Sequence, residues 1–188
     1  MKIVVVFTCF NRKEKTLKCV ERLIEGNKRI DFKFIIVDDG STDGTQEALE
    51  SSKYSSILKV LKTEGNFYYS RGMNYGMQYI LNKEEKADFL LIVNDDVDFF
   101  NHSIERLIEQ SQKRNYSVIV GATCDEQELQ TYGAVRYQGG FSVKYRMVLC
   151  GEEMECDTFN ANCVLIPYNL FKKTGAMDNY YIHSLGDF

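Results

Sequence analysis

The sequence has a single proline and 13 glycines among its 188 residues, which excludes a collagen-like or proline-rich low-complexity chain. It also has no apolar run of the roughly 20 residues that a membrane-spanning helix requires. The longest runs cover residues 3–7, 34–37 and 89–93. The residues after Met1 lack the longer apolar core and small-residue cleavage site of a signal peptide. We therefore expect a soluble, cytoplasmic protein.

Cysteine and histidine are present, but without the spacing that a metal site or a disulfide framework needs. The six cysteines form no C-x-x-C pair and no zinc-like pattern. Several of them fall inside apolar stretches, where a reduced thiol behaves as a small hydrophobic group. The two histidines, His102 and His183, are far apart along the chain. We predict reduced, structural cysteines and no metal-binding histidine pair.

The charge balance is slightly acidic, because 23 Lys and Arg residues against 27 Asp and Glu residues give a formal net charge of −4. Proteins that bind the phosphate backbone of nucleic acids need clustered positive charge, so we expect no nucleic-acid partner. Hydrophobic residues make up 44% of the sequence. This content is sufficient for a packed core in a chain of one-domain length.

The order of the apolar patterns predicts an α/β fold. Short buried strands are predicted over residues 2–7, 32–37, 57–62, 88–93 and 117–121, separated by helices over 12–25, 45–52, 69–82 and 103–114. Such alternation is typical of a mostly parallel central sheet flanked by helices. Residues 132–137, 141–149 and 158–166 predict a small antiparallel region, followed by a helix over 168–173. We expect a single domain, with a parallel part in residues 1–122 and an antiparallel part in residues 123–188.

Polar residues follow four of the predicted strands. Ligands of parallel α/β sheets bind beyond the carboxyl ends of the strands, so these residues form the candidate site. Residues 8–12 follow the first strand, with Asn11 placed to cap the next helix. The later strands are followed by residues 38–45, by residues 64–66 with Arg71 on the next helix, and by Asp95, Asp96 and Asp98.

The acidic group Asp95, Asp96 and Asp98 has two interpretations. These carboxylates could bind a hard divalent cation, which would offset their mutual repulsion and commonly also binds phosphates. They could equally cap the following helix, whose positive dipole end favours negative charge. The residues by themselves leave both interpretations open.

The other loop residues also allow an ordinary role. Asp38 and Asp39 could accept hydrogen bonds from a base or ribose, or could form a turn with the glycine and serine that follow. Arg12 and Arg71 could bind phosphate oxygens or could be solvated surface residues. The sequence has no G-x-G-x-x-G after the first strand, no G-x-x-x-x-G-K-[ST] and no G-x-S-x-G. Dinucleotide, P-loop and covalent-hydrolase sites are therefore disfavoured.

Taken together, these loops resemble those of the family-two glycosyltransferases, which have the GT-A fold. Residues 36–45, which read Ile-Val-Asp-Asp-Gly-Ser-Thr-Asp-Gly-Thr, are similar to the most specific motif of that family. Residues 8–12, 65–76 and 91–96 are similar to three further motifs. The chain departs from the pattern at Asn94, which replaces the first acid of a D-x-D motif. This substitution resembles the rhamnosyltransferase-like branch.

The resemblance implies a role for each matched residue. The donor would be a UDP-, dTDP- or GDP-linked sugar, and the cofactor Mn²⁺ or Mg²⁺. Asp96 would be the main metal ligand and Asp98 a weaker candidate. The implied nucleotide-binding residues are Thr8, Phe10, Asn11, Arg12, Asp38, Asp39, Gly65, Asn66, Arg71 and Asp95.

The acceptor side is implied by residues 158–166 and by the last residues of the sequence. Asn160 and Asn162 would face the acceptor, with an ordinary core strand as the alternative. Asp187 matches the catalytic base of the family, although Gly186 stands where Glu is commoner. An inert, frayed terminus is the alternative for Asp187. Relatives continue beyond this point, so we expect a donor-binding half followed by a truncated acceptor half.

We therefore predict a metal-dependent, inverting transfer of a sugar from a nucleotide-diphosphate donor to an acceptor hydroxyl, in polysaccharide or glycan assembly. A non-catalytic nucleotide-sugar-binding module is the alternative. A sugar-nucleotidyltransferase ranks lower because residues 8–12 contain no glycine. The expected partners are the donor and a saccharide or lipid-linked acceptor, and a homodimer is a further candidate. A lipid-linked acceptor would bring the protein to the inner face of the membrane.

Overall fold

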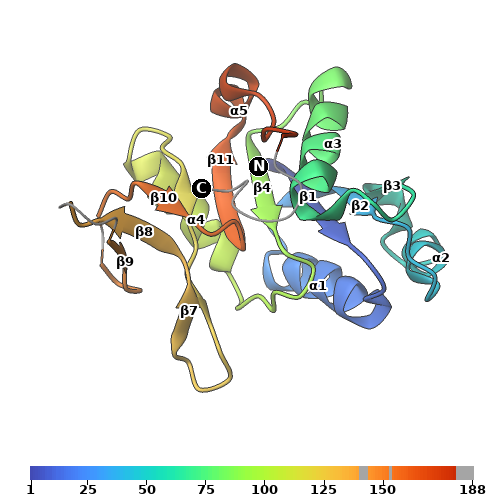
Figure 1. Cartoon of the computed structure of the whole chain (residues 1–188), viewed down its shortest axis with the longest axis horizontal. Helices are drawn as coiled ribbons and strands as arrows, with labels where there is room; N and C mark the ends of the chain where they lie inside the picture. The colour runs from blue at the N-terminus through green and yellow to red at the C-terminus, as the bar shows by residue number, and fades with distance from the viewer. Residues whose placement is uncertain (140–143, 153, 181–188) are drawn as a thin grey trace.

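A computed structural model describes residues 1–139, 144–152 and 154–180 of the chain. Its first half alternates strands and helices: β1 (Lys2–Cys9), α1 (Lys13–Gly26), β2 (Asp31–Asp38), α2 (Thr45–Glu50), the 3₁₀ turn η1 (Ser55–Ile57), β3 (Leu58–Lys62), α3 (Tyr68–Asn82), β4 (Phe89–Val93) and α4 (Ser103–Lys113). Shorter elements follow (Figure 1): β5 (Ile119–Val120), β6 (Thr123–Cys124), β7 (Gln130–Tyr132), β8 (Ala134–Tyr137), β9 (Tyr145–Met147), β10 (Thr158–Phe159), β11 (Cys163–Pro167) and α5 (Tyr168–Thr174).

The central sheet is mixed but mostly parallel, with the strand order β3-β2-β1-β4-β11-β5. Strand β1 pairs in parallel with both β2 and β4, and β2 pairs in parallel with β3. Strand β11 is antiparallel to both β4 and β5. The predicted α/β fold with a mostly parallel sheet is confirmed, and β11 lies between β4 and β5.

The predicted strand over residues 158–166 is divided between two sheets. Thr158 and Phe159 pair with β8, whereas residues from Cys163 onward pair with β4 in the central sheet. The predicted strand over 132–137 is also interrupted, because Gly133 separates β7 from β8. The antiparallel pairing of β8 with β9 agrees with the prediction, with Tyr137 opposite Tyr145. Residues 140–143 of this hairpin lie outside the described part of the chain.

The apolar side chains of the sheet form two layers of core. Alternate residues of β1, such as Val5 and Phe7, pack on one face against α1, α2 and α4. The intervening residues, such as Val4 and Val6, pack on the other face against α3 and α5. Because both faces are covered, the central strands are buried on both sides and read as continuous apolar runs. Figure 1 shows α1 and α3 on opposite sides of the sheet.

Helix α3 lies unusually close to β1 because two glycines face the strand. A Cβ atom on Gly72 would stand 2.6 Å from Thr8 Cγ2, and one on Gly76 would stand 2.8 Å from Val6 Cγ2. Real Cβ atoms essentially never approach so closely, so only glycine fits here without displacing the helix. This close packing places the first turn of α3, with Arg71, beside the carboxyl end of β1.

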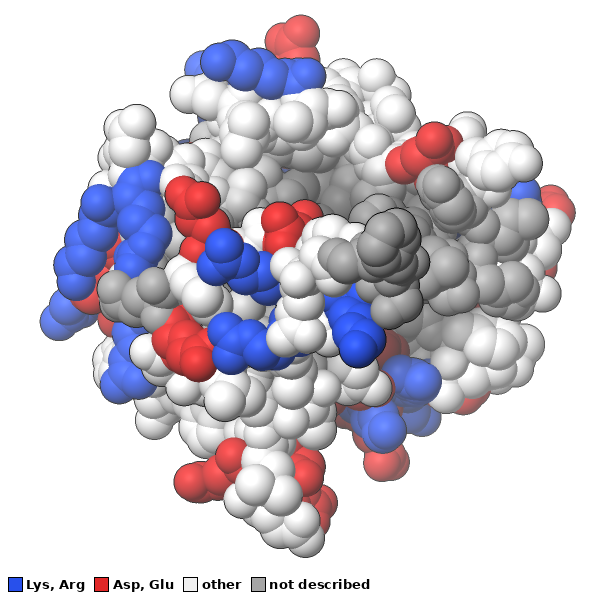
Figure 2. Space-filling view, turned by 60° about the vertical axis from the view of Figure 1, so that its left-hand side comes forward, with Lys and Arg blue, Asp and Glu red and all other residues white. Residues whose placement is uncertain are grey.

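Free thiols occur at all six cysteines, as predicted. Cys9, Cys19 and Cys163 are buried, and burial raises the pKa of each thiol, so these side chains stay neutral and pack as small hydrophobic groups. Within the described residues, no helix combines the length and apolar character needed to cross a membrane. On the face shown in Figure 2, Lys and Arg side chains lie among Asp and Glu side chains rather than in a patch of one sign.

Candidate functional site

The carboxyl ends of β1, β2, β3 and β4 meet at one edge of the sheet, because all four strands run in the same direction. These strands end at Cys9, Asp38, Lys62 and Val93. The polar loops that the sequence predicted to lie together therefore do so. Hydrogen bonds and ion pairs between the loops then hold many of the candidate side chains in place.

Several hydrogen bonds join the loops after β1 and β2. The backbone N–H of Asn11 donates to Ser41 Oγ at 2.9 Å, and the N–H of Thr42 donates back to Asn11 Oδ1 at 2.8 Å. The N–H of Lys13 donates to Asp43 Oδ2 at 3.0 Å. The prediction that Asn11 caps α1 is wrong, because its side chain is bonded to the second loop and it has a left-handed φ of 52°.

The neighbouring acids Asp38 and Asp39 have different surroundings. Asp39 accepts hydrogen bonds from Thr63 Oγ1, from Phe67 N–H and from Tyr68 N–H, so it orders the start of α3. Asp38 accepts one bond, from Ser41 N–H at 2.9 Å to its Oδ1. The buried Oδ2 of Asp38 has no hydrogen-bond partner among the described residues.

The loop after β3 touches the loop after β2 through the backbone. A Cβ atom on Gly40 would stand 2.8 Å from Gly65 N, and both glycines have positive φ angles. Asn66 is exposed at the tip of this loop. In the first turn of α3 the guanidinium of Arg71 lies 5.8 Å from the centre of the Phe67 ring. Arg71 is thus held at this edge by its own helix and by an aromatic face.

The loop after β4 contains the most distinctive arrangement of charge. Arg12 Nη1 lies 3.1 Å from Asp95 Oδ1 and 2.9 Å from Asp96 Oδ2. The Asp95 side chain is only 6% exposed, whereas that of Asp96 is 40% exposed. Burial raises the pKa of the Asp95 carboxyl, and the positive charge of Arg12 opposes that rise. Thr16 of α1 donates a further hydrogen bond to Asp95 Oδ2 at 3.3 Å.

Asp98 belongs to a separate group of charges. Its two carboxylate oxygens lie 2.5 Å from Lys18 Nζ and 3.5 Å from Arg22 Nε, both on α1. Asp98 therefore pairs with the outside of α1, while Asp95 and Asp96 share Arg12. Among the described residues, no group of three or more His, Cys, Asp and Glu side chains is placed to hold a metal ion.

Asn94, at the position of the first D-x-D acid, is bonded to Asn162, which directly precedes β11. Its side-chain Nδ2 donates to Asn162 Oδ1, and its backbone N–H donates to Asn162 O at 3.3 Å. Asn160, the other predicted acceptor residue, donates its backbone N–H to Gly133 O at 3.1 Å. The structure thus ties Asn162 directly to the acidic loop. The sequence held no signal for this pair, because the two residues are 68 positions apart.

The remaining predicted residues lie around the same edge. Thr8 is in the last part of β1, packed against Gly72, and Phe10 is 52% exposed on the next loop. Asp187, the predicted catalytic base, lies outside the described residues.

The carboxylates of Asp95 and Asp96 suit a cation that is shared with a phosphate ligand. Mg²⁺ and similar hard ions are usually held by one or two carboxylates together with substrate phosphates, rather than by a complete cage of protein ligands. Two neighbouring carboxylates, one of them exposed, provide that partial set. The residues present therefore fit a divalent cation that binds together with a diphosphate.

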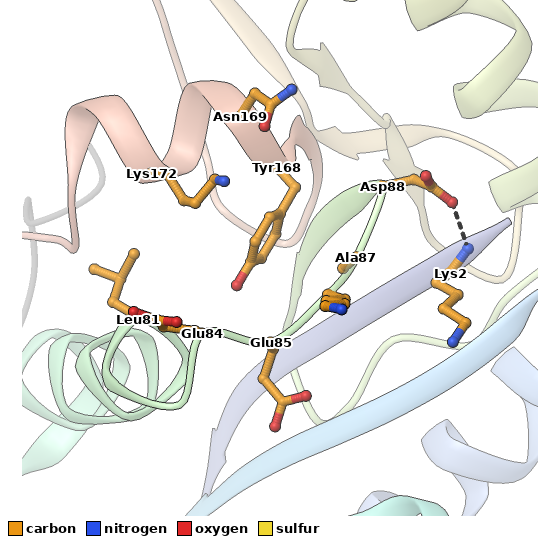
Figure 3. A pocket seen from close by; sticks show the side chains of 10 residues that line it. Lys2, Leu81, Glu84, Glu85, Ala87, Asp88, Tyr168, Asn169 and Lys172 are labelled. Atoms are coloured by element: carbon orange, nitrogen blue, oxygen red, sulfur yellow. Dashed lines mark hydrogen bonds between the residues drawn. The ribbon is translucent and has the colours of Figure 1, made fainter.

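A separate hollow of about 780 Å³ lies at the opposite edge of the sheet. Figure 3 shows the Tyr168 ring pointing into it from α5, with Lys2 and Asp88 at the starts of β1 and β4. Since Lys2 is the first residue of β1 and Asp88 directly precedes β4, the hollow lies at the amino ends of these strands, remote from the carboxyl ends where the candidate residues gather. It is not part of the candidate site.

Comparison with known proteins agrees with this site and fold. Residues 4–163 match the model of the family described as "Glycosyl transferase family 2". The chain belongs to this family. The glycosyltransferase GlyG of Streptococcus pneumoniae serotype 4 is 27% identical over 120 residues, which are 63% of this chain and 38% of GlyG. The chain spans only 36% to 48% of the length of the curated relatives it matches.

Two solved structures show the same fold. The TarS fragment 1–349 of S. aureus in complex with UDP has a TM-score of 0.67 and 18% identity, covering all of this chain and 53% of that fragment. The mannosyltransferase PcManGT of Pyrobaculum calidifontis, in complex with GDP-Man and Mn²⁺, has a TM-score of 0.62 and 12% identity, covering 95% of this chain and 47% of its own. The predicted GT-A fold is confirmed by these likenesses.

Proposed function

We propose that this family-two chain transfers a sugar from a nucleoside-diphosphate donor to an acceptor hydroxyl, with inversion. The observation that carries the proposal is the pair Asp95 and Asp96 at the carboxyl edge of the sheet, beside a loop that supplies Arg12. The structures of the same fold in complex with UDP and with GDP-Man and Mn²⁺ support a nucleotide-sugar donor. Ligands of parallel α/β sheets bind beyond the carboxyl ends of the strands, which is the edge where this pair lies. Assembly of a polysaccharide or glycan is the corresponding biological role.

The loops at this edge offer groups for each part of such a donor. The loops after β1 and β2, locked together by Asn11 and Thr42, form the side that would hold the base. The partnerless Asp38 Oδ2 is an acceptor for a base or ribose donor group. Arg71 would approach the diphosphate, because its guanidinium matches phosphate oxygens and it lies in the first turn of α3 at this edge.

Asp96, with Asp95 behind it, would hold Mn²⁺ or Mg²⁺ together with the diphosphate. When bound, such an ion neutralises the negative charge that develops on the leaving diphosphate. Arg71 would help to orient the donor by binding its diphosphate, while the bonds between the loops after β1 and β2 hold the base side of the site in place. A general base on the opposite side of the anomeric carbon is required for inversion, and we assign that role to Asp187 from the family resemblance.

The decisive experiment compares two Asp→Asn substitutions at opposite ends of β4. Asp96→Asn is expected to reduce sugar transfer by about 100-fold or more, since it removes a charge that acts in the transition state. Asp88→Asn, before β4 and at the other edge, should retain the wild-type rate. The assay measures transfer and donor hydrolysis with UDP-, dTDP- and GDP-sugars in the presence of Mn²⁺.

Three outcomes separate the candidate functions. Equal activity of Asp96→Asn and wild type would contradict the proposed site. Donor binding by calorimetry, without transfer or hydrolysis of any donor, would indicate a nucleotide-sugar-binding module instead. Full activity of Asp187→Asn would contradict the assignment of the base.

A further inference from the structure

The carboxylate pair proposed to hold a divalent ion is already bridged by a cation of the protein itself. One nitrogen, Arg12 Nη1, contacts an oxygen of Asp95 at 3.1 Å and an oxygen of Asp96 at 2.9 Å. A divalent ion bound by this pair would need carboxylate oxygens that the Arg12 guanidinium now contacts. Arg12 and a divalent ion would therefore compete for the same pair of oxygens.

Arg12 offsets the negative charge of Asp95 and Asp96. Asp95 is buried beside Asp96, so the two carboxylates would repel one another strongly without a nearby positive charge. The neighbouring basic side chains Lys18 and Arg22 of α1 point to Asp98 instead. Removing Arg12 would thus leave two adjacent carboxylates whose repulsion favours the binding of another cation.

Arg12 is also able to leave the pair. Its side chain is 47% exposed, and it comes from the short loop between β1 and α1, at the edge where the donor would bind. A guanidinium is permanently charged and its planar fork fits phosphate oxygens as well as carboxylates. An entering diphosphate therefore offers Arg12 an equivalent partner close to its present position.

We propose that Arg12 is a displaceable counter-cation that occupies Asp95 and Asp96 until a nucleoside diphosphate draws it away. This inference rests on the proposed function of the site. While Arg12 bridges the carboxylates, a divalent ion meets like-charge repulsion and binds weakly. Once Arg12 has turned to the diphosphate, both carboxylates are free for the ion. The ion and the nucleotide consequently bind with positive cooperativity, and each strengthens the binding of the other by the same factor.

The test measures Mn²⁺ binding to the full chain by the electron paramagnetic resonance of free Mn²⁺, with and without saturating UDP or GDP. In wild type, nucleoside diphosphate should tighten Mn²⁺ binding by about 10-fold or more. Arg12→Gln should bind Mn²⁺ alone about 5-fold more tightly than wild type and should lose most of the effect of the nucleotide. Arg12→Lys keeps the charge and should bind Mn²⁺ alone as weakly as wild type.

Arg22→Gln is the matched control, because it removes the same charge from a residue that pairs with Asp98. It should keep both the wild-type affinity for Mn²⁺ and the wild-type cooperativity. The inference is overturned if Arg12→Gln binds Mn²⁺ no more tightly than Arg22→Gln. It is also overturned if nucleotide tightens Mn²⁺ binding equally in Arg12→Gln and wild type.

The proposed function fails in a distinguishable way. If neither UDP nor GDP binds to any variant in the presence of Mn²⁺, the site is not a donor site. In that event, tighter Mn²⁺ binding by Arg12→Gln would still support competition between Arg12 and the ion for the carboxylates. Thermal unfolding of each variant checks that the substitutions leave the fold intact.

Discussion

The parallel part of the molecule and its antiparallel region are built in opposite ways. Residues of β4 are buried along the whole strand, and β1 and β2 are buried along most of their lengths. The strands β6 to β10 contain two to four residues each, and their side chains are half-buried or exposed. The ring centres of Tyr137 in β8 and Tyr145 in β9, for example, are 6.0 Å apart, yet both side chains remain exposed. Stability is therefore concentrated in the parallel part.

Strand β11 connects these two regions. In sequence it follows the antiparallel strands, but its residues Cys163, Val164 and Leu165 are buried in the cores of the central sheet. The antiparallel region is thus anchored at one end by a strand that belongs to the other region. The loop after β4 and the segment before β11 consequently meet at the hydrogen bond between Asn94 and Asn162.

The largest expected difference between the regions is the loss of unfolding free energy when a leucine is replaced by alanine. Leu91→Ala, in the fully buried middle of β4, should lower the free energy of unfolding by about 2–5 kcal/mol, because it leaves a cavity in the core layer that packs against α1 and α4. Leu129 lies in the loop before β7 and is 64% exposed, so Leu129→Ala should change the free energy of unfolding by less than about 0.5 kcal/mol. Chemical denaturation measures both, and a similar cost for the two substitutions would remove the contrast.

A smaller effect is expected at the junction of the two regions. Asn162→Ala removes the acceptor of the Asn94 amide and should lower the free energy of unfolding by about 0.5–1.5 kcal/mol. Asn160→Ala is the control, since Asn160 is bonded to Gly133 through its backbone N–H, which the substitution keeps. If Asn160→Ala cost as much as Asn162→Ala, the side-chain bond to the acidic loop would not be what secures β11 here. Denaturant unfolding of both variants decides the point.

The smallest expected effect is that the hydrogen bonds joining the loops after β1 and β2 depend on pH. Hydrogen bonds from the Thr45 hydroxyl and from the Lys13 N–H hold the pKa of Asp43 below its ordinary value of 3.8. A lowered pKa in the folded state adds stability above that ordinary value, and this contribution is lost as the pH falls through the folded pKa. Asp43→Asn should therefore be less stable than wild type at about pH 6, with a difference that shrinks below about pH 3.

Asp125→Asn provides the counterpart in the antiparallel region. Asp125 accepts hydrogen bonds from the N–H groups of Gln127 and Leu129 within its own turn, whereas Asp43 links two loops about 30 residues apart. At about pH 6 the cost of Asp125→Asn should be the smaller of the two, since it releases only a local turn. Thermal unfolding over the pH range tests this, and a larger cost for Asp125→Asn would reverse the comparison between the regions.

Sequence reasoning was most successful where one local pattern determines the structure. The apolar runs of β1, β2 and β4 predict buried strands, because a strand covered on both faces needs apolar side chains throughout. The motif over residues 36–45 likewise predicted a loop at the carboxyl edge, because its Asp, Gly, Ser and Thr residues follow an apolar strand and favour turns. The division between β10 and β11 was missed, because residues 158–166 have a continuous strand pattern that does not reveal which strands will be their partners.

The candidate site shows the same limit at the level of single side chains. Asp38 and Asp39 are chemically identical neighbours with different partners. The Asp39 carboxylate accepts a hydrogen bond from the first backbone N–H of α3, whereas one oxygen of Asp38 has no partner among the described residues. Arg12 was expected at the nucleotide, but the structure pairs it with Asp95 and Asp96, 83 and 84 positions away. Such pairings depend on how separate loops approach one another, which no local pattern encodes.

By itself the sequence determined the α/β class, the set of polar strand ends and the family to which their motifs belong. These features follow from local periodicity and from short motifs, which are complete within a few residues. Only the tertiary structure decided that β11 enters between β4 and β5, that Asn94 binds Asn162 and that Arg12 bridges the acidic pair. Each of these is a contact between segments distant in the chain, selected by packing and by charge compensation once the sheet has formed.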